Sequence, residues 1–216
     1  QNFKYIGKPF FLAEDATKDR HEKPVGSIWS EVRNDNSIPN AYRHSTEAQP
    51  LHTDGSYIPN FPSSTLMACV RNNVKGGETT FIDSILVYEI LESVDPSLLR
   101  NLLENDFIHE RSGFTKKQRV MIDSNNNIYL NWNFYCLSQV LSNNQKKIAK
   151  EFYTFLNQSA EINSAKMSVI LRPGDSVFWR DNLCLHGRNS FFAEQKSDRF
   201  LWKCAIDIGS SIESEI

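Results

Sequence analysis

The sequence predicts a mainly β fold with a few inserted helices, arranged as a double-stranded β-helix, or jelly roll. Two observations favour this class. About nine short runs rich in Val, Ile, Phe, Tyr and Trp follow residue 51, and Gly, Pro or Asn bounds most of them. Helical patterns interrupt these runs in only two places, whereas a parallel sheet of βαβ units needs a helix between successive strands.

The strands are expected in the following order. Pro, Asn, His and charged residues break every period between Asp15 and Gln49, so we expect a long loop region there with one short strand around Ser27 to Val32. The later strands are expected at 65–71, 78–82, 107–110, 119–122, 128–133, 167–171, 176–179, 183–186 and 199–207. The segment 123–127 predicts a hairpin turn, because Asn and Asp tolerate positive φ angles.

Helices are expected between some of these strands. Asp95 is a good N-cap and is followed by a proline, which favours a helix over 97–104, and another helix is expected over 84–92. Further on, Ser142 and Gln145 have the spacing of a capping box. The apolar stripe expected to pack this later helix into the core is Ile148, Phe152, Phe155 and Leu156.

Composition narrows the function classes. The 216 residues fit one domain, and 40% apolar with 23% charged residues exclude a disordered chain. A net charge of −2 without a basic stripe argues against nucleic-acid binding, and no run approaches the roughly 20 apolar residues of a membrane span. We expect a single domain over 1–216, without nucleic-acid or membrane partners. The missing initiator Met also leads us to expect further N-terminal residues in the full gene product.

Cysteine usage predicts the compartment. The four cysteines are scattered without a CxxC pair, which argues against a disulfide scaffold and a structural zinc ribbon. No signal-peptide pattern opens the chain, so we expect free thiols in the cytoplasm. Cys184 is expected to pack as a small apolar residue. Three histidines without partners at ligand spacing are expected in structural or surface roles: His21, His44 and His109.

A candidate metal site begins at His52-Thr53-Asp54. Residues i and i+2 of a strand point to the same face, so His52 and Asp54 can present an imidazole and a carboxylate to one ion. This pair alone is a weak signal, but His186 follows a strand pair far downstream and can supply a third ligand from a neighbouring strand. Two histidines and one carboxylate leave three coordination positions open, which suits Fe(II) with a chelating co-substrate and O2.

Two further residues favour an acidic co-substrate. Thr79 ends the motif Gly-Gly-Glu-Thr, and Arg199 begins a strand of otherwise buried-looking residues. An arginine fork with a neighbouring hydroxyl group gives charge-assisted binding of a carboxylate. The alternative for Arg199 is a place on the solvent face, paired with Asp198.

Together these motifs resemble the taurine dioxygenase-like (TauD/TfdA) Fe(II)/2-oxoglutarate-dependent oxygenases, and they lean toward the γ-butyrobetaine hydroxylase branch. The resemblance covers roughly residues 48–207 and rests on His52-Thr53-Asp54, Gly76-Gly77-Glu78-Thr79, the turn at 171–175, Asp181-Asn182, His186-Gly187-Arg188 and Arg199. It implies that His52, Asp54 and His186 bind iron. It also implies that Thr79 and Arg199 hold the distal carboxylate of 2-oxoglutarate.

The resemblance implies a reaction as well. 2-Oxoglutarate and O2 are converted to succinate and CO2 while a C–H bond of a small polar substrate, such as an amino acid or related acid, is oxidised. Hydroxylation is the default outcome. The carboxylate of Asp54 argues against halogenation, since halogenating relatives lack it, but desaturation, ring closure and bond cleavage stay open.

Substrate residues are less well defined. Lys203 replaces the second arginine of a common Arg-x-x-x-Arg motif, and it is expected either to share a cavity with Arg199 or to reach water at the barrel mouth. Asn131 and Asn133 alternate with Trp132, so the two amides either line a polar pocket or cap a strand edge. The substrate candidates are Lys203, Asn131, Asn133, Arg188 and Tyr57.

Two other functions are compatible with the same residues. A zinc hydrolase can use the same triad with an activated water, although it leaves Thr79 and Arg199 unexplained. A catalytically silent jelly-roll module can bind a small acid or a protein partner. The oligomeric state is not encoded in any motif.

Overall fold

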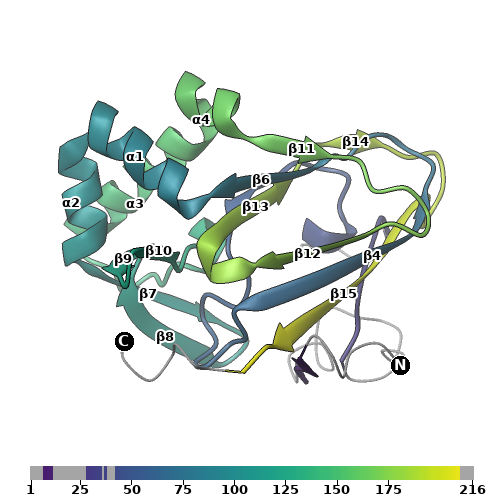
Figure 1. The fold of residues 1–216 in the computed structure, drawn as a ribbon, viewed down its shortest axis with the longest axis horizontal. Helices are drawn as coiled ribbons and strands as arrows, with labels where there is room; N and C mark the ends of the chain where they lie inside the picture. The colour runs from purple at the N-terminus through teal and green to yellow at the C-terminus, as the bar shows by residue number, and fades with distance from the viewer. Residues whose placement is uncertain (1–6, 12–27, 36, 38–41, 210–216) are drawn as a thin grey trace.

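The computed structural model describes residues 7–11, 28–35, 37 and 42–209, and it confirms the jelly roll (Figure 1). Two antiparallel sheets form the barrel. The helices and the short hairpins gather at one end of it (Figure 1). No helix in the described part of the chain is both long and apolar enough to cross a membrane.

The first sheet contains five strands in the order β1-β15-β4-β12, with β2 also paired to β15. Their bounds are β1 Lys8–Pro9, β2 Ser30–Arg33, β4 Ser64–Asn72, β12 Ser176–Arg180 and β15 Arg199–Asp207. The second sheet contains four strands in the order β11-β6-β13-β3. Their bounds are β3 Gln49–His52, β6 Thr79–Asp83, β11 Met167–Val169 and β13 Cys184–Arg188.

Three two-stranded pairs complete the β structure of the described residues. They are β5 Lys75–Gly76 with β14 Phe191–Phe192, β7 Asp106–Arg111 with β8 Phe114–Arg119, and β9 Met121–Ser124 with β10 Asn127–Leu130. The expected hairpin turn between β9 and β10 is confirmed, since Asn125 and Asn126 have φ angles of 53° and 59°. Strand β8 was not expected, and the strand expected at 119–122 is instead the end of β8 and the start of β9. The polar residues of β8 gave no apolar signal for it.

Three of the four α-helices in the described residues begin within one residue of their predicted positions. The helices are α1 Ser84–Val94, α2 Pro96–Glu104, α3 Asn143–Gln158 and α4 Ala160–Ala165, with 3-10 turns η3 Tyr42–His44, η4 Phe134–Cys136 and η5 Asp181–Leu183. Asp95 accepts a hydrogen bond from the backbone N–H of Leu98 at 2.9 Å, and the capping box of Ser142 and Gln145 is present. The short helix α4, capped by Ser159, was not expected.

The core has two main parts on opposite faces of the second sheet. The larger cluster packs α1, α2 and α3 against that sheet through residues such as Leu51, Ile82 and Leu185. A second cluster fills the space between the two sheets and includes Phe81, Trp179 and Leu201. Side chains alternate between the faces of a strand, so the neighbours of Leu51 and Leu185 in sequence point into the barrel.

Candidate metal centre

The two histidines of the candidate site lie on paired strands. In the antiparallel pair of β3 and β13, His52 is directly opposite His186. Leu51 and Leu185 pack on the helix side, so the alternation of side chains directs both imidazoles into the barrel. Their ring centroids are 4.2 Å apart, which brings two residues 134 positions apart in the chain to one place.

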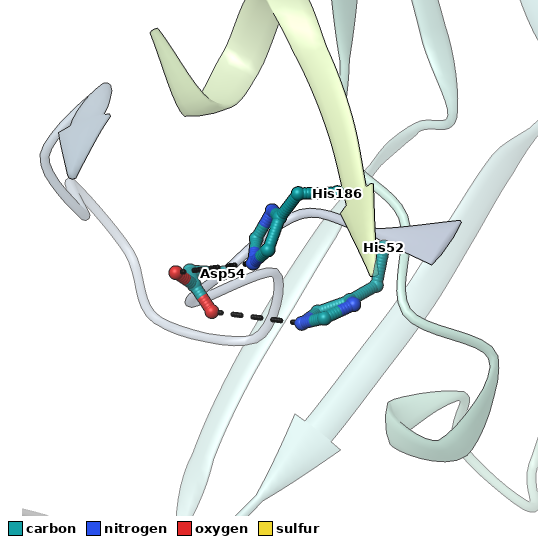
Figure 2. A group of neighbouring side chains, drawn as sticks. All are labelled: His52, Asp54 and His186. Atoms are coloured by element: carbon teal, nitrogen blue, oxygen red, sulfur yellow. Dashed lines mark ion pairs between the residues drawn. The ribbon is translucent and has the colours of Figure 1, made fainter. Parts of the chain in front are cut away.

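Asp54 lies outside strand β3, contrary to the expectation that it shares an extended strand with His52. The strand ends at His52, and the next residue is held by Trp132: Thr53 donates its backbone N–H to the Trp132 carbonyl at 2.7 Å, and the Thr53 hydroxyl accepts the Trp132 N–H at 2.9 Å. A turn follows at Gly55, where φ is 55°. This turn, and not the alternation of a strand, brings the Asp54 carboxylate to the histidines (Figure 2).

The three side chains converge on one space (Figure 2). Oδ1 of Asp54 is 3.7 Å from Nε2 of His52, and Oδ2 is 3.7 Å from Nε2 of His186. The three ligand atoms lie within 4.8 Å of one another. Two imidazole nitrogens and one carboxylate oxygen on one side of a space of this size fit a divalent transition metal with open positions.

The electrostatics favour the protonation states that a metal requires. Burial lowers the pKa of both histidines, assisted at His52 by the neighbouring imidazole, and the pKa of His186 is about 4. Burial opposes the charge of Asp54, but Lys203 and His186 together hold the pKa of Asp54 well below its usual range. Near pH 7 the site therefore has two neutral imidazoles and one carboxylate, which are the forms that bind metal.

Asp181 lies behind the triad. Burial, together with the negative charge of Asp54, raises the pKa of Asp181 to about 8. Oδ1 of Asp181 accepts the indole N–H of Trp179 at 3.0 Å and lies 3.2 Å from Nδ1 of His186. Oδ2 accepts the backbone N–H of Asp54 at 2.7 Å. The Asp-Asn motif was noted in the sequence, but no position in it indicated these contacts.

A cavity of about 170 Å³ opens in front of the triad, and its wall includes Thr79 and Arg199. Arg199 is 4% exposed and donates from Nη2 to the Thr79 hydroxyl at 3.4 Å. Burial lowers the pKa of Arg199 to about 10, so the guanidinium stays charged near pH 7. Pairing with Asp198 on the solvent face is not what the structure shows, because that carboxylate accepts backbone N–H groups of Glu194 and Gln195.

Gly77 explains why a Gly-Gly pair precedes Thr79. Its φ is 76°, and a Cβ at this position would lie 3.3 Å from Nε of Arg199 and 3.1 Å from the Phe191 side chain. Glycine therefore provides both the left-handed backbone and the room in which the Arg199 side chain passes.

Lys203 and Tyr57 line the same cavity as Arg199. The ammonium group of Lys203 forms an ion pair with Oδ2 of Asp54, so it points to the metal site, and the Lys203 side chain is partly exposed. Arg188 also lines the cavity, but Nη2 donates to the carbonyls of Ser45 at 2.8 Å and Glu47 at 2.6 Å. These bonds tie Arg188 to the chain that enters β3.

The two asparagines do not share a pocket. The strand expected at 128–133 ends at Leu130, so the alternation assumed for Asn131 and Asn133 does not continue. Asn133 lines the cavity in front of the triad and caps η4 by accepting the N–H of Tyr135 at 3.2 Å. Asn131 lines a second cavity of about 220 Å³, where it accepts from Lys116 at 3.2 Å.

Gln49 is a site residue that sequence analysis missed. Its side-chain nitrogen is 3.2 Å from Nε2 of His52, the nitrogen that faces the triad. Three positions along a regular strand would place the two side chains on opposite faces. However, His186 pairs with His52 while Arg188 pairs with Gln49, so β3 has one extra residue and its bulge returns Gln49 to the site.

The remaining histidines and cysteines behave largely as expected. His44 contacts the Arg33 carbonyl through Nδ1 at 3.0 Å, and burial, assisted by the charge of Lys116, lowers the pKa of His109 to about 3. His21 lies outside the described residues. All four cysteines are free, and Cys184 is half-buried against the core between the sheets.

The chain is similar to known proteins in sequence and in fold. The family model described as "Taurine catabolism dioxygenase TauD, TfdA family" matches residues 4–205. Human gamma-butyrobetaine dioxygenase is 22% identical in an alignment 175 residues long, which covers 75% of this chain and 45% of that protein. The chain thus spans about half the length of the curated relatives that it matches.

Solved structures with the same fold bind iron. Asparagine oxygenase in complex with Fe(II), 3-hydroxyasparagine and succinate has a TM-score of 0.74 at 14% identity, over 94% of this chain and 61% of that one. The non-heme iron oxygenase OrfP in complex with Fe and alpha-ketoglutaric acid has a TM-score of 0.67 at 18% identity, again over 94% and 61% of the two chains. At these identities the likeness shows the fold.

Proposed function

The chain belongs to the taurine catabolism dioxygenase TauD/TfdA family, and on this premise we propose that it is a non-heme Fe(II)- and 2-oxoglutarate-dependent dioxygenase. Its reaction would oxidise a C–H bond of a small polar substrate, by default through hydroxylation, and release succinate and CO2. The observation that carries the proposal is the convergence of His52, Asp54 and His186 at a cavity whose wall also holds a buried arginine.

The triad is proposed to hold Fe(II) through Nε2 of His52, Nε2 of His186 and the carboxylate of Asp54. When bound, Fe(II) supplies the oxidising chemistry together with O2 and 2-oxoglutarate. The protein binds and orients the reactants. Its buried imidazoles stay neutral and its carboxylate stays ionised near pH 7, so no proton has to leave the ligands before the metal binds.

Arg199 and Thr79 are proposed to bind the distal carboxylate of 2-oxoglutarate. Both side chains are buried in the wall of the cavity, and they already contact each other. A buried guanidinium favours a carboxylate strongly, because the charge-assisted hydrogen bonds replace water in a region of low dielectric constant.

A small amino acid or related acid is the proposed substrate. Lys203, Arg188, Tyr57 and Asn133 line the cavity, and the cationic and polar groups among them suit the carboxylate and polar atoms of such a molecule. The solved structures of similar fold contain hydroxylated asparagine or hydroxylated arginine, which are small amino acids. Asn131 is left out of this proposal because it lines the second cavity.

We also propose that the chain forms one oxygenase domain of the cytoplasm. The strand β1 pairs with β15, so segments from near both ends of the sequence share one sheet. Four free thiols are typical of a reducing compartment.

The test is anaerobic addition of Fe(II) and then 2-oxoglutarate to the purified protein. The proposal predicts a weak visible charge-transfer band of the chelated co-substrate, and succinate release once O2 and a substrate are added. The band should be lost in His186→Ala and Arg199→Ala variants and kept in Arg172→Ala, which removes an exposed arginine of a turn. Hydrolysis with zinc and without 2-oxoglutarate would instead indicate the zinc hydrolase. Ligand binding without a band would indicate the silent binding module.

A further inference from the structure

Asp181 joins the elements that carry two of the three candidate metal ligands. It is the first residue of η5, directly after β12, and it is 3% exposed. Its backbone N–H donates to the Ser63 carbonyl at 2.6 Å, which fixes its main chain against the start of β4. The side chain therefore has a defined position inside the barrel, next to the triad.

The side-chain oxygens of Asp181 accept two N–H groups and lie beside a third nitrogen atom, Nδ1 of His186. Oδ2 accepts the backbone N–H of Asp54 at 2.7 Å. Oδ1 accepts the indole N–H of Trp179 at 3.0 Å and lies 3.2 Å from Nδ1 of His186. The Trp179 ring in turn packs against the His186 ring, with centroids 4.9 Å apart. One side chain thus contacts a metal ligand from β13 and another from the turn after β3.

We propose that Asp181 is a positioning residue for the metal centre, which holds the His186 ring and the Asp54 backbone in the geometry that binds the ion. This inference rests on the proposed function. An acceptor at Nδ1 keeps the proton on that nitrogen and leaves the lone pair of Nε2 for the metal.

The other histidine supports this assignment. Nδ1 of His52 lies 2.9 Å from the Pro50 carbonyl, which is an acceptor built into β3 itself. Nδ1 of His186 makes no hydrogen bond within the described part of the chain, and the acceptor group that lies beside it, at 3.2 Å, is the Asp181 side chain. The backbone N–H of Asp54 also needs an acceptor. Asp54 lies two residues beyond the end of β3, and its backbone N–H is held by Asp181 and not by the sheet.

The replacement Asp181→Asn tests the proposal with little change in volume. Asparagine has one acceptor oxygen, so it cannot accept N–H groups on both sides as the carboxylate does. We expect the affinity of the metal-free protein for Co(II) or Mn(II), measured by calorimetric titration, to fall about 10- to 100-fold. The visible spectrum of bound Co(II), which reports its ligands, should also change.

Asp175→Asn is the matched control. Asp175 is exposed, lies in the turn before β12, and accepts the backbone N–H of Arg172 at 2.8 Å. The same chemical change there should leave metal affinity and the Co(II) spectrum as in the wild type. Thermal unfolding of each metal-free variant separates loss of the fold from loss of the site.

The outcomes are distinct. Weaker metal binding by folded Asp181→Asn supports the proposal, and wild-type affinity with an unchanged Co(II) spectrum overturns it while the proposed function stands. A wild-type protein that binds no divalent metal overturns both. If Asp181→Asn does not fold, Trp179→Phe carries the test, since it keeps a ring against His186 and removes one donor to Asp181. Weaker binding by that variant supports the proposal, and unchanged binding overturns it.

Discussion

Replacing Gly187 with Ala is expected to damage the metal site from within the sheet. Gly187 follows His186 in β13 and faces β3, where an added Cβ would lie 2.7 Å from the backbone oxygen of Gln49 and 3.0 Å from the Thr80 hydroxyl. Its φ is not in the left-handed region, so alanine has no conformational penalty there and the contact alone decides the outcome.

The size of the effect follows from that contact. Cβ atoms essentially never lie closer than 3.0 Å to such an atom, and ordinary contact begins at 3.4 Å, so β3 and β13 must move apart locally. Inserting a methyl group into a packed interior costs about 1–3 kcal/mol. For a chain of this size the midpoint of thermal unfolding should fall by about 2–4 °C per kcal/mol. The same movement separates His52 from His186, and a site displaced by about 0.5 Å loses affinity for its ligand.

Thermal unfolding of the metal-free protein and calorimetric titration with Mn(II) measure the two effects. Gly174→Ala is the control, because Gly174 has φ +95° and nothing within 4 Å of an added Cβ. Alanine there strains the backbone without a collision, so stability should fall while metal affinity stays unchanged. If the Gly187→Ala protein has the same unfolding midpoint and the same Mn(II) affinity as the wild type, the close approach of the two strands is refuted.

Three further predictions concern other parts of the molecule. Arg199→Ala should raise the Kd of the Mn(II)-loaded protein for 2-oxoglutarate by at least about 10-fold, because a charge-assisted hydrogen bond contributes about 1.5–3 kcal/mol; an unchanged Kd in calorimetry would contradict the assigned role. The pKa of His109 is about 3 in the folded protein and about 6.5 in the unfolded chain, so below about pH 6.5 only the unfolded state protonates this imidazole. The free energy of unfolding should therefore fall by about 1.4 kcal/mol for each pH unit below that value. Urea unfolding at pH 7 and pH 5 should show this loss, and His109→Gln should reduce it. Ser142→Ala removes the cap of α3 and should cost about 1 kcal/mol in the same assay, whereas no loss would argue against the capping box.

The fold was largely predictable because its signals are local. Strands β4, β6, β12 and β15 carry branched and aromatic residues between turn residues, and Asp95 and Ser142 mark helix starts through hydrogen bonds that depend on a few neighbouring positions. Strand β8 escaped prediction because Thr115 to Arg119 are polar. Its pairing with β7 gives it its extended shape, and that partner is not encoded in its own composition.

The site was predictable in its members more than in its geometry. The motifs indicated His52, Asp54, His186 and Arg199, and the structure brings all four to one cavity. The sequence did not show how these four side chains are positioned. Asp54 is placed by a turn, and Gln49 reaches the site through a bulge, which depends on a partner strand far away in sequence.

The register of β3 against β13 links the core to the metal site. Leu51 and Leu185 are buried under the helices, and the residues that follow them, His52 and His186, point to the opposite face. A slip of one residue in either strand would expose a leucine to the cavity and turn a histidine into the helix layer. Burying one leucine stabilises the fold by about 1.5–3 kcal/mol, and an unpaired imidazole in that layer would add a further cost. The packing of the helices therefore selects the register that brings the two imidazoles together, so mutations in the helix-side core are expected to affect metal affinity as well as stability.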